Sequence, residues 1–458
     1  MARLWARGHQ LYGPVAWVDR PQGLLLPYRL VAATGWEPMA RVLAMVAAAI
    51  TTAALGAAGW ALAGRRAAVI AAVLFAVVSP APHLEGFTGN GELLAAAFTS
   101  TAIAAAAWWL VRGDRRLLLL AGVAAGIGPL VKQSAVDAAV AITVLVVVEA
   151  VRRRRSLWRD LGTFACGVAI PITLTLAHAA TIGLGDWWFA VAGHRSQTDS
   201  VVHGPFRHRL ELFRDSLGPF ARSLGPLTVL AAGGVVAARR AHCLTLPLAW
   251  LAAAAAGFAV GGLYHPHYWV QMIAPLGLLA AIGLDTLLAR APSLGLGVAL
   301  GALLATLLLA APVYLASTDT EAADLAFHDR RVTAARSIGD YIAATTAPDA
   351  RVAVLWANAA VPWYADRTPA FRYLWLGPLS QIHGAAADAR AVITGADPPE
   401  VVVINTKLGE LDPDGDVALA LAERYQLVRW VGPYPIYRLR PLSSGWRLVG
   451  LPAASAVP

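Results

Sequence analysis

The stretch RRLLLLAGVAAGIGPLVKQSAVDAAVAITVLVVVEAVRRRR, residues 115–155, contains two apolar runs with arginines at both outer ends. A helix that crosses a bilayer needs about 20 predominantly apolar residues, and each run approaches that length. The two runs are joined near Lys132 and Gln133. Short cytoplasmic loops are enriched in Lys and Arg. The arginines at the two ends of this stretch therefore predict that both ends are cytoplasmic. Lys132 is then expected on the opposite side.

The same pattern extends over most of the 458 residues. Hydrophobic residues make up 58% of the chain and charged residues 14%, whereas a soluble domain carries roughly 25% charged residues. The composition predicts a mainly α, polytopic helical membrane protein. We expect about ten spans, at residues 39–63, 67–82, 92–111, 116–131, 134–150, 161–183, 218–238, 243–262, 270–289 and 293–315.

The short connections between these spans alternate in character. One set is rich in arginine and is predicted to be cytoplasmic; it comprises residues 65–66, 112–116, 152–159, 239–240 and 290. The other set is predicted to face the outside of a plasma membrane; it comprises residues 1–38, 83–91, 132–133, 184–217, 263–269 and everything after 315. This arrangement explains the net charge of +9 better than binding to nucleic acid does.

Three regions follow from this topology. Residues 1–38 are predicted to form the first outer loop, 39–315 the transmembrane domain and 316–458 an extracytoplasmic α/β domain. In the last region we expect a helix at 321–347 and strands at 351–357, 400–406, 425–432 and 434–440. It has no phosphate-loop or dinucleotide-binding fingerprint. The first eight residues lack an apolar core, so we expect a further span upstream to place residue 1 outside.

Five segments resemble the GT-C superfamily of polyprenyl-phosphate-sugar-dependent glycosyltransferases, which includes protein mannosyltransferases and aminoarabinose transferases. The stretch LLLLAGVAAGIGPLVKQSA, residues 117–135, is the most specific. The others are residues 6–28, 83–98, 261–279 and 338–373. In the first of them Arg20 replaces the family's usual Lys and Gln22 its second Pro. The family's catalytic Asp, at the end of its first span, would precede Met1.

The resemblance implies transfer of a sugar from a polyprenyl-phosphate donor to a glycan, lipid or protein acceptor on the outer face of the membrane, with inversion. Such a reaction needs a carboxylate base for the acceptor hydroxyl and positive charge on the departing phosphate. Membrane lipid is the expected surrounding, and nucleic acid is not an expected partner. The alternatives are a transporter or flippase of lipid-linked saccharides, or an inactive lipid-binding relative. A transporter is expected to carry polar residues near the midplane, whereas here they gather at one face.

The resemblance also assigns candidate site residues. Asp19 and Glu92 are the catalytic candidates, with Asp19 orienting the acceptor or a metal. The candidates for binding the donor phosphate are Arg20, Lys132, Gln133, His265 and His267. Each has a simpler interpretation: residues 19–21 as an interfacial turn, Lys132 as a side chain that reaches the interface, and the two histidines as part of an aromatic belt.

Two further groups of polar residues are weaker candidates. His83 and Glu85 are predicted to contact the acceptor or, with Glu92, to hold a divalent cation; the alternative is that they are solvated or capping residues. The identity of any metal is not predicted. The stretch 184–217 mixes aromatic residues with His194 and Arg195, which favours an interfacial helix beside the donor or a surface that faces lipid.

Overall fold

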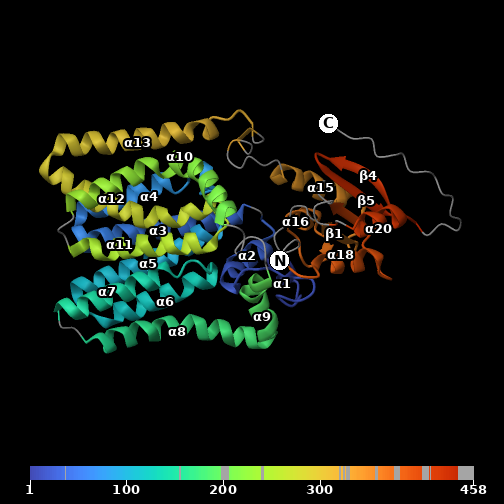
Figure 1. The fold of residues 1–458 in the computed structure, drawn as a ribbon, viewed down its shortest axis with the longest axis horizontal. Helices are drawn as coiled ribbons and strands as arrows, with labels where there is room; N and C mark the ends of the chain where they lie inside the picture. The colour runs from blue at the N-terminus through green and yellow to red at the C-terminus, as the bar shows by residue number, and fades with distance from the viewer. Residues whose placement is uncertain are drawn as a thin grey trace. The chain divides into compact units, whose positions relative to one another are not determined.

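The computed structural model of the protein describes residues 1–36, 38–153, 156–197, 206–238, 242–318, 321–322, 325, 331–355, 359–375, 382–404, 412 and 414–441. The chain divides into two units, Met1–Thr333 and Ala334–Pro458. The first unit is a bundle of long helices, and the second contains the sheet (Figure 1).

Ten long helices in the first unit coincide with the ten predicted apolar runs. They are α3 (Met39–Ala63), α4 (Arg65–Val78), α5 (Gly91–Arg112), α6 (Arg115–Val131), α7 (Asp137–Arg153), α8 (Leu157–Ile182), α10 (Phe206–Ala238), α11 (Thr245–Gly261), α12 (Val270–Arg290) and α13 (Pro292–Tyr314). Among the described residues, seven segments are long and apolar enough to cross a membrane. The helices α4, α6 and α7 are shorter, so a multi-pass membrane protein is supported while a count of ten spans is not confirmed.

The remaining helices of this unit are short. Those whose bounds lie wholly in the described residues are α1 (Ala2–Ala6), α2 (Gln22–Thr34), α9 (Leu184–Val191), and the 3-10 turns η1 (Pro82–Leu84), η2 (Gly193–Gln197), η3 (His242–Leu244) and η4 (Pro266–Trp269). Figure 1 shows α1, α2 and α9 gathered at one end of the long helices. The predicted outer loop at 1–38 therefore contains helices that pack on the bundle end.

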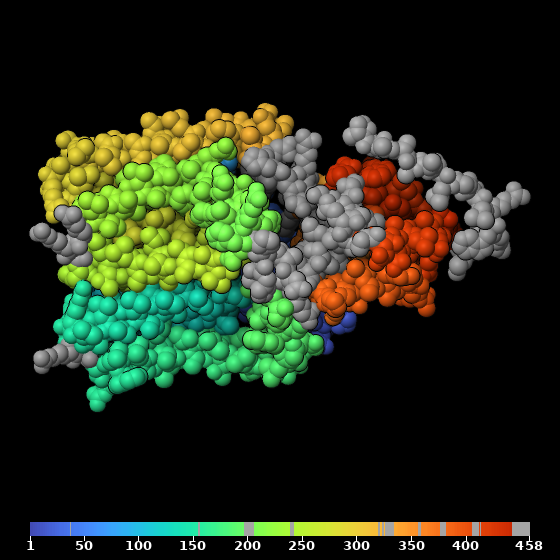
Figure 2. All heavy atoms as spheres, viewed as in Figure 1, coloured from blue at the N-terminus to red at the C-terminus, as the bar shows by residue number. Residues whose placement is uncertain are grey.

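The helices α5 and α12 form the core of the bundle. In each, 72% of the most apolar window is buried, against 17% in α8 and 6% in α13. An apolar helix buried on all sides needs small residues where neighbours approach it, and α5 is accordingly rich in buried alanine. The helices α8 and α13 lie along opposite edges of the bundle (Figures 1 and 2).

Glycines allow α6 and α8 to approach closely. A Cβ atom added to Gly167 would lie 2.3 Å from the carbonyl oxygen of Leu119 and 2.9 Å from the Cα of Gly122. Close backbone approach through small residues is the usual way in which helices associate in lipid. These two glycines therefore fix the position of α6, the helix that Lys132 directly follows.

We expect Gly167→Ala to destabilise the folded chain by about 1–3 kcal/mol, because the added methyl group forces two backbones apart. The matched control is Gly162→Ala on the same helix, where an added Cβ would meet nothing within 4 Å. Thermal unfolding in detergent measures both. Equal melting temperatures for the two variants would contradict this account of the packing.

Charged residues divide between the two ends of the bundle. At one end Arg66 contacts Asp285 (Nε to Oδ1, 2.6 Å) and Arg115 contacts Asp160 (Nε to Oδ1, 2.8 Å). Because the helices alternate in direction, the other end collects the carboxyl ends of α4 and α6 and the amino ends of α5, α7 and α12. The candidate site residues of the sequence lie at that second end.

The second unit is a five-stranded mixed sheet with helices. Its strands are β1 (Arg351–Leu355), β2 (Thr368–Pro369), β3 (Val401–Ile404), β4 (Tyr425–Val431) and β5 (Tyr434–Leu439), in the order β2-β1-β3-β5-β4. The strands β1, β2 and β3 are parallel, whereas β5 is antiparallel to β3 and β4. The helices are α15 (Arg331–Thr345), α16 (Val361–Ala365), α18 (Ala385–Thr394) and α20 (Asp416–Arg424). The four predicted strands are present in the described residues, and residues 356–357 and 405–406 of the first two predictions lie outside the described residues.

Candidate functional site

The centre of the site is an ion pair between Lys132 and Glu92. Lys132 follows the last residue of α6, in an extended conformation (φ −144°, ψ 124°) that ends the helix. Glu92 lies in the first turn of α5, which is capped by the side chain of Asn90 (Leu93 N to Oδ1, 2.8 Å). The lysine ammonium contacts Oε1 of Glu92. Their side chains are 15% and 3% exposed, so the two charges are almost removed from solvent.

Lys132 also contacts an aromatic ring. Its Nζ lies 4.0 Å from the centroid of the Tyr268 ring, where the face of the ring attracts a cation. Burial, followed by the positive charges of Arg20 and Arg195, lowers the pKa of Lys132 to about 6. The contact with Glu92 acts in the opposite direction, because a neighbouring carboxylate favours the charged amine. A further anion beside Lys132 would have the same effect as Glu92.

His267 lies between two carboxylates. Its Nδ1 is 3.5 Å from Oε2 of Glu85, and its Nε2 is 3.9 Å from Oε1 of Glu92. Glu85 adopts a left-handed conformation (φ 54°) directly after η1. Thr88 and Asn90 donate hydrogen bonds to its carbonyl oxygen (2.7 and 3.2 Å). The strained turn is thus held in a shape that brings Glu85 to the histidine.

The turn at residues 19–21 is attached to the same end of the bundle. Asp19 and Arg20 form an ion pair. The side-chain amide of Gln133 donates to the carbonyl oxygens of Asp19 (3.2 Å) and Val191 (3.1 Å), and so connects α6 to this turn and to α9. Tyr12 donates to the carbonyl of Arg20 (2.9 Å). Oδ1 of Asp19 is buried and accepts no hydrogen bond within the described part of the chain.

The structure brings most of the predicted residues together. Lys132, Glu92, His267 and Glu85 form one contact network, and the rings of His265 and His267 are stacked 5.5 Å apart. Gln133 takes a positioning role rather than a contact with this network. His83 lies on η1 and lines a neighbouring cavity. Among the described residues, no three His, Cys, Asp or Glu side chains are grouped so that they can hold a metal ion.

Two further residues lie near this cluster: Arg195, predicted from the sequence only as part of the weaker candidate stretch 184–217, and Asp137, which was not selected from the sequence. Arg195 interacts electrostatically with Arg20, Asp19 and Tyr268, which places a third cation near the turn. Asp137, 1% exposed, accepts a hydrogen bond from Trp250 Nε1 (3.0 Å). It lines a chamber of about 10 Å³ together with Glu92 and Lys132. The sequence feature that could have identified Asp137 is an acidic residue inside an apolar run. For Arg195 the feature is a basic residue within a stretch rich in aromatic residues.

Comparisons with known proteins bear on the fold. No protein-family model and no curated protein matches the sequence. A solved structure of ArnT from Cupriavidus metallidurans, bound to undecaprenyl phosphate, is similar over 97% of this chain and 93% of that chain, at 18% identity and a TM-score of 0.65. An oligosaccharyltransferase from Archaeoglobus fulgidus, in complex with zinc and sulfate, is similar over 96% of this chain and 68% of that chain, at 14% identity and a TM-score of 0.51.

Both of these proteins are GT-C superfamily members. The fold of this chain is therefore the GT-C fold, as the five sequence segments predicted, and the likeness extends over nearly its whole length. Of these two structures, that of the aminoarabinose transferase ArnT has the higher TM-score to this chain.

Proposed function

We propose that the protein is a glycosyltransferase that moves a sugar from a polyprenyl-phosphate donor to a glycan, lipid or protein acceptor. The observation that carries this proposal is the buried Lys132–Glu92 pair with His267 beside it. It combines an amine that can bind phosphate with a carboxylate that can accept a proton. The fold supports the proposal, since the similar ArnT structure holds undecaprenyl phosphate.

In the proposed reaction, the donor phosphate binds to Lys132 and Arg20. Phosphate competes with Glu92 for the ammonium group, because both are anions that need the same cation. Glu92 is then available to accept the proton of the acceptor hydroxyl. The acceptor oxygen forms a bond to the anomeric carbon as the bond from that carbon to the phosphate oxygen breaks. Polyprenyl phosphate leaves with its negative charge next to Lys132, Arg20 and Arg195.

The proposal is tested with membranes that contain the chain and undecaprenyl phosphate carrying a labelled sugar. We expect release of undecaprenyl phosphate that depends on the chain and on an added lipid extract as a source of acceptor. Chromatography of the lipid products measures this release. No release above control membranes, with both hexose and pentose donors, would count against a transferase.

The lowered pKa of Lys132 predicts a pH dependence of donor-phosphate binding. Phosphate favours the charged amine, so binding takes up a proton wherever the amine of the free protein is partly neutral. We therefore expect the affinity for undecaprenyl phosphate to rise as the pH falls from 8 towards 6, by at most about tenfold per pH unit. In Lys132→Arg the guanidinium is always charged, and this part of the dependence is expected to vanish. Calorimetric titration of both proteins gives the difference; parallel pH curves would contradict it.

We also propose that the site end of the bundle and the second unit face the outside of the plasma membrane. The arginine-rich connections at the opposite bundle end support this orientation. In a chain without Cys166 and Cys243, cysteines introduced at Thr88 and Ser317 are expected to react with an impermeant maleimide in whole cells. A cysteine at Arg112 is expected to react only after lysis. Labelling of positions 88 and 317 on different sides would overturn the orientation.

A further inference from the structure

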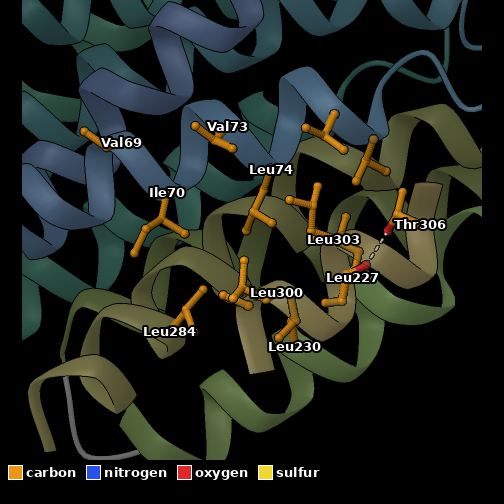
Figure 3. Close-up of a pocket in the computed structure, with 14 residues that line it drawn as sticks. Val69, Ile70, Val73, Leu74, Leu227, Leu230, Leu284, Leu300, Leu303 and Thr306 are labelled. Carbon is orange, nitrogen blue, oxygen red and sulfur yellow. Dashed lines mark hydrogen bonds between the residues drawn. The ribbon is translucent and has the colours of Figure 1, made fainter. Parts of the chain in front are cut away.

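An apolar cavity lies between α4, α10, α12 and α13. It measures about 200 Å³, and Figure 3 shows side chains from these helices converging on it, among them Val73, Leu230, Leu284 and Leu300. Its only hydroxyl belongs to Thr306 and already donates to the carbonyl of Ala302 (2.9 Å). The lining thus offers no unpaired polar group, and it suits a hydrocarbon chain.

A second cavity of about 210 Å³ shares Val77, Val78 and Thr306 with the first. It extends to the end of the bundle that carries the site, where its lining includes His83, Arg222, Ser223 and Tyr314. The hydroxyl of Tyr314 donates to the carbonyl of Pro80 (2.5 Å) and ties the end of α13 to the turn before η1. The two cavities adjoin at these three shared residues. Together they are called the passage below, with an apolar body and a polar mouth.

The polar mouth contains a buried hydroxyl without a partner. Ser223 is 4% exposed, and within the described part of the chain its Oγ makes no hydrogen bond. By contrast, Thr228 on the same helix donates to the carbonyl oxygen of Leu224, four residues earlier (2.8 Å). Ser223 makes no such hydrogen bond within its own helix. A buried hydroxyl normally has a partner. Beside it, exposed Arg222 has no ion pair or hydrogen bond to any described residue.

We propose that this passage binds a phosphate-bearing membrane lipid, with one hydrocarbon chain in the apolar body and the phosphate at Arg222 and Ser223. A guanidinium and a hydroxyl donor match phosphate oxygens. One part of this inference rests on the proposed function, namely the identification of the bound lipid as the acceptor of the sugar. The class of acceptor is then a phosphate-bearing amphipathic lipid rather than a soluble glycan or a protein.

The contact network favours the acceptor over the donor as the occupant. Lys132, the proposed phosphate ligand of the donor, contacts Glu92, which is next to His267; His267 in turn contacts Glu85. His83 precedes Glu85 by two residues and lines the passage. The proposed base is thus connected to the donor cation on one side and, through His267 and Glu85, to the turn that carries His83 on the other. An inverting displacement needs this order, because the acceptor oxygen approaches opposite the leaving phosphate.

The test uses the full chain in detergent with two photoreactive lipids, a diazirine-bearing phosphatidylglycerol and the matching phosphatidylcholine. Cross-linked peptides are mapped by mass spectrometry. We expect labelling of α4 and α13, and a decrease of several-fold in Ala302→Trp, which fills the apolar cavity. The matched control is Leu308→Trp on the exposed face of the same helix. Arg222→Gln is expected to lower the ratio of anionic to zwitterionic labelling about tenfold, and Ser223→Ala to lower it less.

The readout separates this inference from the proposed reaction. If the passage binds the acceptor, labelling persists in Lys132→Ala and is not displaced by undecaprenyl phosphate, while binding of undecaprenyl phosphate persists in Ala302→Trp. Labelling that Ala302→Trp and Arg222→Gln both leave unchanged would overturn the site. Labelling that is displaced by undecaprenyl phosphate would overturn the assignment to the acceptor. Should Ala302→Trp fail to fold, the Arg222 and Ser223 variants decide the question alone.

Discussion

Replacing Lys132 by alanine is expected to reduce sugar transfer by about 10²–10³-fold. The amine is the buried cation that would meet the departing phosphate, and removing one such electrostatic contact typically costs about 3–4 kcal/mol in the transition state. Turnover is measured as release of undecaprenyl phosphate per mole of purified chain. The matched control is Arg112→Ala at the opposite end of the bundle, which is expected to keep full activity.

Loss of the lysine also leaves Glu92 buried without its partner, and this alone can destabilise a protein by about 3–5 kcal/mol. The double variant Lys132→Met with Glu92→Gln removes both charges and separates the two effects. We expect it to recover thermal stability relative to Lys132→Met while remaining inactive. Turnover within threefold of the unmodified chain in Lys132→Ala would refute the phosphate role of this residue.

Replacing Glu92 by glutamine is expected to lower kcat by about 10²–10⁴-fold, the usual contribution of a general base. The amide keeps the size of the carboxylate but cannot take the acceptor proton. Binding of undecaprenyl phosphate is expected to be retained or strengthened, because Lys132 loses the anion that competes with phosphate. Single-turnover kinetics and a binding titration measure the two quantities separately.

The control for this variant is Glu149→Gln. Glu149 is also a buried acid on a long helix, 5% exposed and paired with Arg153 (2.8 Å) at the other end of the bundle. It is expected to change stability and not kcat. An unchanged kcat in Glu92→Gln would rule out the base, and a parallel loss of phosphate binding would show that Glu92 acts in the donor site instead.

The positions of the long helices can be predicted from the sequence because the apolar runs and the Pro and Gly residues that end helices agree. The predicted span at 39–63 matches α3 (Met39–Ala63), which is bounded by Pro38 and Gly64. The helix α10 begins at Phe206, well before the predicted span at 218, and continues through Pro219. Hydropathy predicts the part of a helix that lies in the membrane. It does not predict polar helical turns of the same helix that extend out of the membrane.

The pairing within the site does not follow from the sequence. Lys132 was selected as an ionisable residue at the end of two predicted spans, whereas Glu92 was selected from the resemblance to the GT-C superfamily. The contact between Lys132 and Glu92 depends on the packing of α5 against α6. His267, which contacts Glu92, lies in the turn directly before a third helix, α12. The contribution of Arg195 depends on the position of η2 against the turn at Asp19 and Arg20. Periodicity predicts which face of a helix is apolar, but it does not predict which helix lies next to it.

The most direct test of the account distinguishes cleavage of the donor from its movement across the membrane. Purified chain is reconstituted into sealed liposomes with undecaprenyl phosphate that carries a labelled sugar, together with an acceptor lipid extract. The fate of the label and the leaflet of the donor are followed together. The account predicts that undecaprenyl phosphate accumulates as labelled sugar passes to another lipid, and that Glu92→Gln stops this. An intact donor that moves between the leaflets would contradict the account and indicate a transporter.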